Sequence, residues 1–340
     1  MLRRLCQMPK KLRDMEDDLA PELPRVGFVV LSHENDGKLS RLIAALDREY
    51  DTPPIAIHHD FHQAPLDRSS YRSGILWVED SLRTGWGKWS VVEGALKAFR
   101  LLYDNSDVDW FFHLSAADYP VCPSKRTRAE LARASVDAFV DARPLIAGQQ
   151  AAAEMTGNLN GQLTQFDTAG NRLRARRFYR SPQWWLPIIR FKPRLRVGRW
   201  TYRPDIDLNS PFKDGVTCFY GDHWFTANRK AVAALLERSP LNRALQQHYR
   251  NRVLPEESYY ATLLANTPGL KICLDNRRFA EWNGGGAHPM LLTAAQIPDI
   301  VASNAYFARK FDGSSSAITE IDAYLVADKQ AEPKSAPHQS

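Results

Sequence analysis

Short continuous runs of hydrophobic residues alternate with amphipathic patterns in the first part of the chain. Residues 25–33 (RVGFVVLSH) and 54–60 (PIAIHHD) are rich in Val and Ile, which is typical of strands buried on both faces of a parallel sheet. Between them, residues 39–50 repeat leucine and isoleucine at helical spacing. The order strand, helix, strand predicts a doubly wound α/β fold, in which ligands bind at the carboxyl ends of the strands.

The same alternation returns further along the chain. It predicts helices over residues 89–103 and 255–266, a buried strand over 110–114, a strand followed by a helix over 216–238, and a short strand over 276–282. Residues 148–209 have no regular period, and we interpret them as a long insertion. We therefore expect an N-terminal extension, one domain that contains this insertion, and a disordered polar tail, over residues 1–24, 25–327 and 328–340.

The composition is that of an ordinary globular chain, with 44% hydrophobic and 25% charged residues among 340. No stretch approaches the roughly 18 apolar residues of a membrane-spanning helix. The basic N-terminus lacks the apolar core of a secretory signal. The four cysteines are scattered without a CxxC pair, which argues against structural zinc and favours a reducing compartment. These features predict a cytoplasmic protein.

Positive charge is concentrated in one segment of a chain whose net charge is only +6. Residues 172–203 contain ten arginines and one lysine, interleaved with aromatic residues, and no acidic residue. Such a pattern suits an anionic surface, and arginine with aromatic residues also suits nucleic acid. Because no recognisable nucleic-acid-binding fold accompanies the segment, we expect peripheral contact with an anionic membrane and no nucleic acid partner.

Two carboxylates follow predicted strands, where this architecture places ligands. Asp60 ends the strand at 54–60, and Asp118 lies in the SAADYP string after the strand at 110–114. Asp60 could bind a nucleoside or cap the next turn, and the sequence leaves both open.

The histidines around Asp60 raise the question of a metal site. His58 and Asp60 would share one face of a strand and His59 the other, so His58, Asp60 and His62 could ligate a metal only if the chain bends. The paired carboxylates that hold a cation in many sugar-nucleotide enzymes are missing after the strand at 110–114. The strings DVD (107–109) and DID (205–207) do not follow a predicted buried strand. We expect no metal site.

Further candidate groups lie in the last third of the chain. Glu256 and Glu257 fall in the first turn of a predicted helix, where one acidic residue suits the helix dipole and the other could serve as a general base. Two cationic pairs, at 277–278 and 309–310, flank a glycine-rich loop. Fixed cations of this kind can neutralise a departing diphosphate, although surface charge is the commoner role of such a pair.

Taken in their order along the chain, these strings resemble the core-2/I-branching N-acetylglucosaminyltransferase and peptide O-xylosyltransferase family. The resemblance covers about residues 25–325. It is carried by FVVLSH, IHHD, TGWGKWSVVEGAL, FFHLSAADYP, YGDHWFTANRKAV, PEESYYATLL and FARKFD, of which SAADYP and FARKF are the most specific. The disulfide-forming cysteines and Golgi anchor of animal members are missing, which suits a bacterial-type member.

The resemblance implies a GT-A-like, Rossmann-type mixed sheet flanked by helices, and inverting, metal-independent transfer from a UDP-sugar. The sugar would be GlcNAc or xylose, and the acceptor a hydroxyl of a glycan, a lipid-linked molecule or a peptide. The insertion would then contact the acceptor. No cofactor is implied beyond the donor substrate itself.

The resemblance also assigns roles to individual residues. Glu257 matches the catalytic base, and Lys310 matches a lysine that binds the donor diphosphate, with Arg278, or less surely Arg277, as its partner. His223 stands where xylosyltransferase-like members carry Asp, which leaves the donor sugar open. The remaining residues expected at the donor site are Asp60, Thr84, Trp86 and Asp118. Two rival hypotheses are a metal-dependent transferase using His58, Asp60 and His62, and a non-enzymatic module binding anionic surfaces through residues 172–203.

Overall fold

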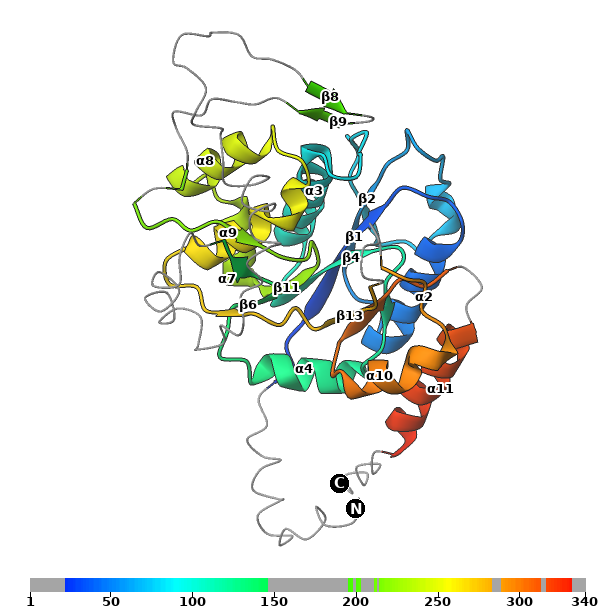
Figure 1. Cartoon of the computed structure of the whole chain (residues 1–340). Coiled ribbons are helices and arrows are strands. Elements are labelled where there is room, and N and C mark those ends of the chain that lie inside the picture. The colour runs from blue at the N-terminus through cyan, green and yellow to red at the C-terminus, as the bar shows by residue number, and fades with distance from the viewer. Residues whose placement is uncertain are drawn as a thin grey trace, which may run out of the picture.

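A mixed seven-stranded sheet forms the centre of the molecule (Figure 1). The computed structural model describes residues 22–145, 195–197, 200–202, 211–212, 214–282, 289–312 and 316–331. β11 is antiparallel to both of its neighbours, whereas the other strand pairs are parallel. The sheet order is β12 (Ile272–Cys273), β6 (Ala138–Val140), β11 (Phe225–Asn228), β4 (Trp110–Ser115), β1 (Val26–Ser32), β2 (Ile55–His59) and β3 (Leu76–Trp77).

Helices cover both faces of the sheet because its central strands are apolar on both sides. α2 (Lys38–Tyr50) and α3 (Trp89–Asn105) follow β1 and β3 in the chain. Phe28 and Val30 of β1 pack in the cluster that contains α2, whereas Val29 packs in the cluster that contains α3. All three side chains are fully buried, as the continuous hydrophobic run predicts.

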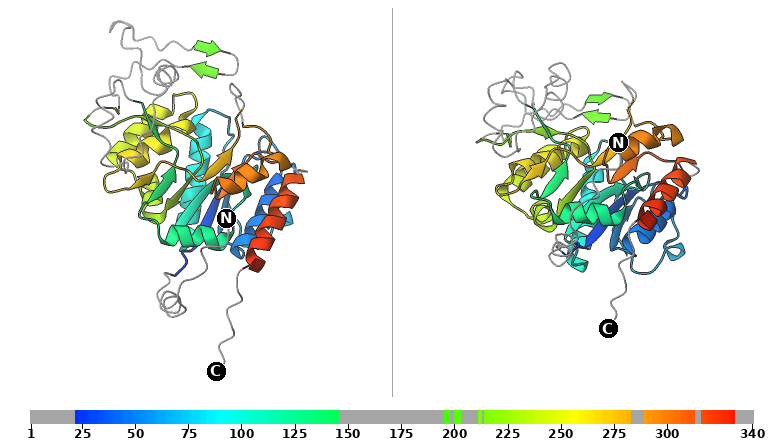
Figure 2. Two further views of the ribbon diagram at one scale, coloured as in Figure 1. Left: turned by 60° about the horizontal axis from the view of Figure 1, so that its bottom comes forward. Right: turned by 90° about the horizontal axis from the view of Figure 1, so that it is seen from below.

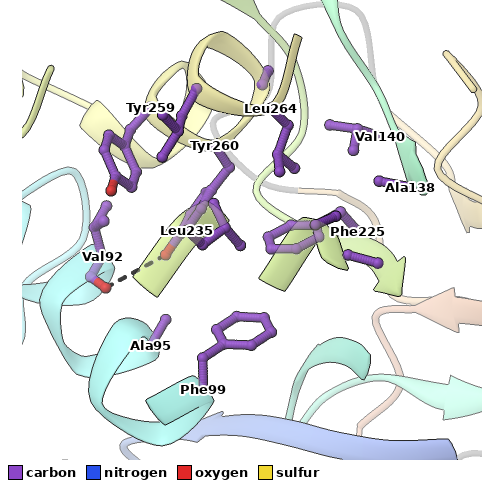
Figure 3. Packing of buried hydrophobic residues seen from close by; sticks show 14 of the residues in the cluster. Val92, Ala95, Phe99, Ala138, Val140, Phe225, Leu235, Tyr259, Tyr260 and Leu264 are labelled. Atoms are coloured by element: carbon purple, nitrogen blue, oxygen red, sulfur yellow. Dashed lines mark hydrogen bonds between the residues drawn. The ribbon is translucent and has the colours of Figure 1, made fainter. Parts of the chain in front are cut away.

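Three helices extend the layer on the α3 face: α7 (Arg229–Leu236), α8 (Pro240–Tyr249) and α9 (Tyr259–Asn266). Figure 3 shows Tyr259 and Tyr260 of α9 directed toward Val92 of α3. Beside them, the Phe99 ring of α3 stacks on the Phe225 ring of β11, with centroids 5.5 Å apart. This packing places α9 against α3, although the two helices are far apart in the chain.

The opposite face carries a second, three-stranded sheet, in the order β13 (Arg278–Ala280), β14 (Phe307–Arg309) and β5 (Tyr119–Pro120). The Phe112 ring lies between the layers, 5.2 Å from the Phe28 ring and 5.4 Å from the Phe307 ring. The helices on this side are α4 (Ser124–Ala132), α10 (Ile297–Ala302) and α11 (Ser316–Ala331), of which α10 and α11 lie close to α2 (Figure 2). Because β5 directly follows β4 in the chain and pairs with β14, β14 lies near the carboxyl end of β4.

The other elements are short. β7 (Arg143–Pro144) pairs with β10 (Phe219–Tyr220), and β8 (Leu195–Val197) pairs with β9 (Trp200–Tyr202). The 3-10 turns of the described ranges are η1 (Arg68–Ser70), η3 (Pro255–Glu257) and η4 (Ala294–Gln296).

The predicted α/β class, mixed sheet and main strands are confirmed, and two expectations need correction. The helix predicted over 255–266 is interrupted, because η3 ends at Glu257 and α9 begins only at Tyr259. Ser258, with φ −141° and ψ −38°, separates them and is fully buried. Residues 328–331, predicted to belong to the tail, are part of α11, and the rest of the predicted tail lies outside the described residues.

Other expectations concern residues outside the described ones. The 148–209 insertion is described only at the β8–β9 pair, and residues 1–21 are not described. The three described cysteines, Cys122, Cys218 and Cys273, do not form disulfide bonds. In the described ranges, none of the helices combines the length and the apolar character needed to span a membrane.

Candidate active site

The carboxyl ends of β1, β2 and β4 meet at one edge of the sheet. The backbone N–H of Asp60 donates to Ser32 O at 2.9 Å, and the N–H of Ala116 donates to Leu31 O at 3.0 Å. These bonds place the loops with Asp60 and Asp118 on either side of the end of β1, as the strand order predicts. Asp107 and Asp109 precede β4 and bind Arg25, so this DVD string lies at the opposite edge.

Asp60 is buried and anchors a neighbouring loop. One carboxylate oxygen accepts from Gln63 Nε2 (2.6 Å), Thr84 N (2.6 Å) and Thr84 Oγ1 (2.8 Å), and the other accepts from His62 N (3.0 Å). Burial alone would raise the pKa of Asp60, but the hydrogen bonds from Gln63 and Thr84 lower it. These contacts match the capping alternative, and nucleoside binding by Asp60 stays a prediction.

The histidines next to Asp60 are engaged with other parts of the fold. His58 Nε2 accepts from Leu82 N at 2.9 Å. The two ring nitrogens of His59 lie 3.1 Å from Ser32 Oγ and 2.8 Å from Ala64 O. The two rings point to opposite faces of β2, as the strand alternation predicts. Among the described residues, no group of three or more His, Cys, Asp or Glu side chains is placed to hold a metal ion.

A loop between Asp60 and α3 carries Thr84 and Trp86. Its first residue, Thr84, is bound to Asp60, as described above. The second of its two glycines, Gly87, accepts from Leu254 N at 3.0 Å and donates to the Glu256 carboxylate at 2.9 Å. The Trp86 side chain between these fixed points is 40% exposed, which leaves its indole ring accessible to a ligand.

The turn η3 presents Glu257 at the same edge of the molecule. Glu257 is partly exposed, whereas its neighbours Glu256 and Ser258 are buried. The backbone oxygen of Glu257 accepts from Gly221 N at 2.7 Å. The Ser258 hydroxyl donates to Phe219 O and lies 2.6 Å from the Tyr249 hydroxyl. The candidate base is therefore fixed through its backbone and the following residue.

Gly221 occupies a position at which a side chain does not fit. A Cβ atom on this glycine would lie 1.6 Å from Asp141 O, a backbone atom that cannot yield like the end of a flexible side chain. The substitution must therefore move the segment that donates to Glu257. Nothing in the sequence marks this residue, because the close approach depends on a contact between distant segments.

We expect Gly221→Ala to lower both stability and kcat. Overpacking of this kind typically costs about 1–3 kcal/mol, and the shift of the Glu257 backbone adds a loss of turnover. Unfolding in urea and kcat at saturating substrates measure the two effects. Gly269→Ala is the control for a loss of stability alone: its φ of +78° strains an alanine, but no atom lies within 4 Å of the place that the Cβ would take, so kcat should stay near the wild-type value. Wild-type kcat in Gly221→Ala would contradict the positioning role.

Planar side chains form a column between Glu257 and the end of β14. The His223 ring lies 4.4 Å from the Trp224 ring and 5.5 Å from the Tyr260 ring, nearly parallel to both. The Arg309 guanidinium continues the column, 4.3 Å from the centre of the Trp224 ring. Burial, followed by the charge of Arg309, lowers the pKa of His223 to about 3. His223 is therefore neutral at physiological pH.

A second imidazole lies against this column. The His113 ring of β4 meets the His223 ring edge-on, with centroids 4.6 Å apart. Burial, followed by the nearby His223 and Arg278, lowers the pKa of His113 well below its usual value. Both histidines can offer hydrogen bonds here without adding charge.

The end of β14 brings two adjacent cations to the Asp118 loop. Arg309 is buried and pairs with the fully buried Asp118 carboxylate, Nε to Oδ1 at 3.0 Å. Lys310 is partly exposed, and among the described residues no hydrogen bond or ion pair engages its Nζ. Burial lowers the pKa of Lys310, and the charge of Arg309 lowers it further. Lys310 is thus the more accessible of the two cations.

The other cationic pair is more deeply involved in the fold. Arg277 forms ion pairs with Glu130 (2.5 Å) and Asp275 (3.1 Å). Arg278 donates to Phe225 O (3.2 Å) and Thr226 Oγ1 (3.1 Å). Burial lowers the pKa of Arg278 to about 10, while the charges of Asp118 and Asp222 oppose that shift. In the described part of the chain, Arg277 has two carboxylate partners within 4 Å, whereas Arg278 has none.

The edge of the sheet thus combines a partly exposed carboxylate, an exposed indole and a partly exposed lysine. Each belongs to a segment fixed by backbone hydrogen bonds to other strand-end loops. A carboxylate can accept a proton, and a lysine can stabilise a developing negative charge. Sequence reasoning missed Gly221 and Ser258, which help to fix these segments. It named Asp118, Arg309 and Glu256 as candidates, but it did not predict the ion pair of Arg309 with Asp118 or the bond of Glu256 to Gly87.

Comparison with known proteins adds a family match. The model of the core-2/I-branching enzyme family matches residues 188–302, a range that contains His223, Glu257 and Arg278.

Curated relatives match over most of the chain at low identity. Xylosyltransferase 1 of Rattus norvegicus is 24% identical over 94% of this chain and 37% of its own length. Beta-glucuronosyltransferase GlcAT14A of Arabidopsis thaliana is 24% identical over 93% of this chain and 67% of its own length. Xylosyltransferase 1 of Homo sapiens is also 24% identical, over 82% of this chain and 27% of its own length. The chain thus spans between 27% and 37% of the length of these two xylosyltransferases.

Proposed function

We propose that this chain is a glycosyltransferase of the core-2/I-branching family and that it transfers a sugar from a UDP-sugar to a hydroxyl group with inversion at the anomeric carbon. The observation that carries this proposal is the placement of Glu257 and Lys310 at the carboxyl edge of the sheet. Both side chains are partly exposed, and both segments are fixed by backbone bonds to neighbouring loops. This pairing of a base with a cation is what a displacement of a diphosphate requires.

The proposed reaction is a single in-line displacement. Glu257 takes the proton of the acceptor hydroxyl as its oxygen attacks the anomeric carbon, and the bond to the UDP oxygen breaks. A positioned general base typically contributes about 10²–10⁴-fold to the rate. Lys310, with Arg278, stabilises the negative charge that grows on the departing diphosphate. Binding both substrates together supplies the remaining acceleration through orientation.

The donor sugar is proposed from the names of the relatives and from the uncharged His223 ring, which stands in the column of planar side chains. GlcNAc and xylose are the first candidates, and the name of the Arabidopsis relative adds glucuronic acid. The exposed indole of Trp86 is suited to pack against a nucleotide or a sugar ring. The proposed acceptors are a glycan, a lipid-linked molecule or a peptide.

A panel of UDP-sugars tests the function. A UDP-sugar that binds the folded protein should increase its free energy of unfolding by RT ln(1 + [L]/Kd) and therefore raise its melting temperature. The same donor should be hydrolysed slowly, or transferred when an acceptor is present. No thermal shift with any UDP-sugar, or with UDP itself, would contradict the proposal.

We expect activity to survive excess EDTA. The proposed charge stabilisation uses Lys310 and Arg278. The His58 ring already accepts from Leu82 N, and the Asp60 carboxylate already accepts from Gln63, Thr84 and the His62 backbone. Turnover is measured after dialysis against EDTA and again after adding Mn²⁺ or Mg²⁺. Loss of turnover in EDTA, restored by either ion, would favour the metal-dependent alternative.

A cytoplasmic location at the inner face of a membrane is also proposed. It is supported by the scattered positions of the cysteines in the sequence and by the basic run at residues 172–203. Vesicle flotation with anionic and with neutral lipids tests the membrane contact. Equal binding to both kinds of vesicle would contradict it.

A further inference from the structure

Glu256 lies beside the proposed base, but its side chain faces another part of the molecule. Its carboxylate is 5% exposed and accepts the backbone N–H of Gly87 at 2.9 Å. The reverse contact is also made nearby, because Leu254 N donates to Gly87 O at 3.0 Å. Gly87 is therefore held at both of its backbone polar groups by the segment that leads into η3.

The loop at residues 84–88 is fixed at its other end by a second buried carboxylate. Asp60 accepts from both the backbone N–H and the hydroxyl of Thr84. The exposed Trp86 lies between these two attachment points, and Arg83 and Lys88 on either side of the loop are exposed as well. Two carboxylates at distant sequence positions thus determine where this indole sits.

The same contacts connect the loop to the base through two packed helices. Trp89 is the first residue of α3 and follows the loop, while Tyr259 is the first residue of α9 and closely follows Glu257. Their rings meet edge-on, with centroids 5.1 Å apart. One turn further along α3, the Tyr260 hydroxyl donates to Val92 O (Figure 3). The bond from Gly87 to Glu256 completes this junction on the side that faces the candidate site.

The geometry points to Glu256 as a positioning residue that holds the loop at residues 84–88, and with it Trp86, in register with Glu257. This inference rests on the proposed function for its kinetic consequences, but the attachment itself is a property of the fold. The relevant feature of Glu256 is the reach of its side chain to Gly87 N, since the acceptor can be any oxygen at that place. Length should therefore matter more than charge.

Two conservative variants separate length from charge. Glu256→Gln keeps the length and an oxygen acceptor but removes the charge, whereas Glu256→Asp keeps the charge and shortens the side chain by one methylene. We expect Glu256→Asp to raise the donor KM by about tenfold, the size of one lost hydrogen bond to a charged group, and Glu256→Gln to raise it much less. A loss of folded protein alone would lower apparent kcat and leave KM unchanged.

Limited trypsin digestion of the full chain reads the attachment without reference to activity. Cleavage after Arg83 and Lys88 depends on local opening of the loop. We expect Glu256→Asp and Glu256→Ala to increase the rate of these two cuts by about tenfold, while Glu256→Gln and Glu257→Gln stay near the wild-type rate. Mass spectrometry identifies the cuts, and the melting temperature of each variant shows whether the whole domain has loosened.

The outcomes distinguish this inference from the proposed function. Unchanged cleavage at Arg83 and Lys88 in both Glu256→Asp and Glu256→Ala would overturn the inference, even if transfer were demonstrated. Faster cleavage in a protein that transfers no sugar would support the attachment and overturn the function. If Glu256→Gln were the most damaging variant in kcat, Glu256 would act as the base and the positioning role would be wrong.

Discussion

Glu257→Gln is expected to lower kcat by about 10²-fold or more while UDP affinity stays near the wild-type value, because a general base acts on the acceptor and not on the nucleotide. Glutamine preserves the size of the side chain and removes its ability to take a proton. The contacts that fix this turn run through the Glu257 carbonyl and through Ser258, and the substitution leaves them in place. The expected loss is therefore in chemistry, with the fold retained.

Kinetics at saturating donor and acceptor, with UDP binding by calorimetry, measure this effect. Glu256→Gln is the matched comparison, since it makes the same chemical change one residue earlier in the same turn. We expect it to cost less than about tenfold in kcat, as for a group that holds a loop through an oxygen acceptor. A benign Glu257→Gln beside a damaging Glu256→Gln would exchange the roles of the two residues. If both variants kept full activity, the proposed mechanism would fail.

The central strands could be predicted from sequence because their signal is local. β1, β2 and β4 are buried on both faces, and that burial leaves a continuous hydrophobic run in each. Placing Asp60 and Asp118 at one edge then followed from chain order alone.

The break at Ser258 had no such local signal. Its hydroxyl binds Tyr249, in the preceding helix, and Phe219 O, which lies 39 residues away in the chain. Residues 255–266 therefore read as one helix with a proline in its first turn, although tertiary hydrogen bonds interrupt it. The same limit applies to Gly221, whose neighbour Asp141 lies on another strand connection.

The roles of the buried carboxylates were undecided for a related reason. A strand-end Asp can bind a ligand or cap a turn, and the choice depends on which donors surround it. In the fold, Thr84 and Gln63 supply those donors to Asp60, and Arg309 supplies the partner of Asp118. No helix or strand was predicted over residues 316–327, although Ala317, Ile321 and Leu325 of α11 recur at helical spacing.

Lys310→Ala is expected to weaken UDP binding by about 10- to 100-fold and to lower kcat further, as charge-assisted contacts with a diphosphate strengthen in the transition state. The partly exposed Lys310 follows the buried Arg309, whose guanidinium is already paired with Asp118 and packed on Trp224. Of these two cations, Lys310 alone is left by the fold to meet an incoming phosphate. Lys310→Arg should rescue only in part, because the guanidinium is longer and planar.

Two comparisons separate a direct contact from a general effect of charge or folding. Lys271→Ala removes the same charge from an exposed position just before β12. Because β12 is the outermost strand of the main sheet, separated from β4 by β6 and β11, this variant should leave UDP binding unchanged. Arg309→Ala should mainly lower stability, by about 3–5 kcal/mol, since it leaves the buried Asp118 carboxylate without its ion-pair partner.

The pH dependence of UDP binding is an independent test of the contact between Lys310 and the diphosphate. The protonated lysine is the form that attracts a diphosphate, and both burial and Arg309 lower the pKa of Lys310. In the wild type, affinity should therefore begin to fall at a pH below the range of an ordinary lysine, and Lys310→Arg should move that fall to higher pH. Calorimetry in metal-free buffers across the alkaline range measures both curves. Wild-type affinity in Lys310→Ala, or identical pH curves for Lys310→Arg and the wild type, would mean that the diphosphate binds away from the end of β14.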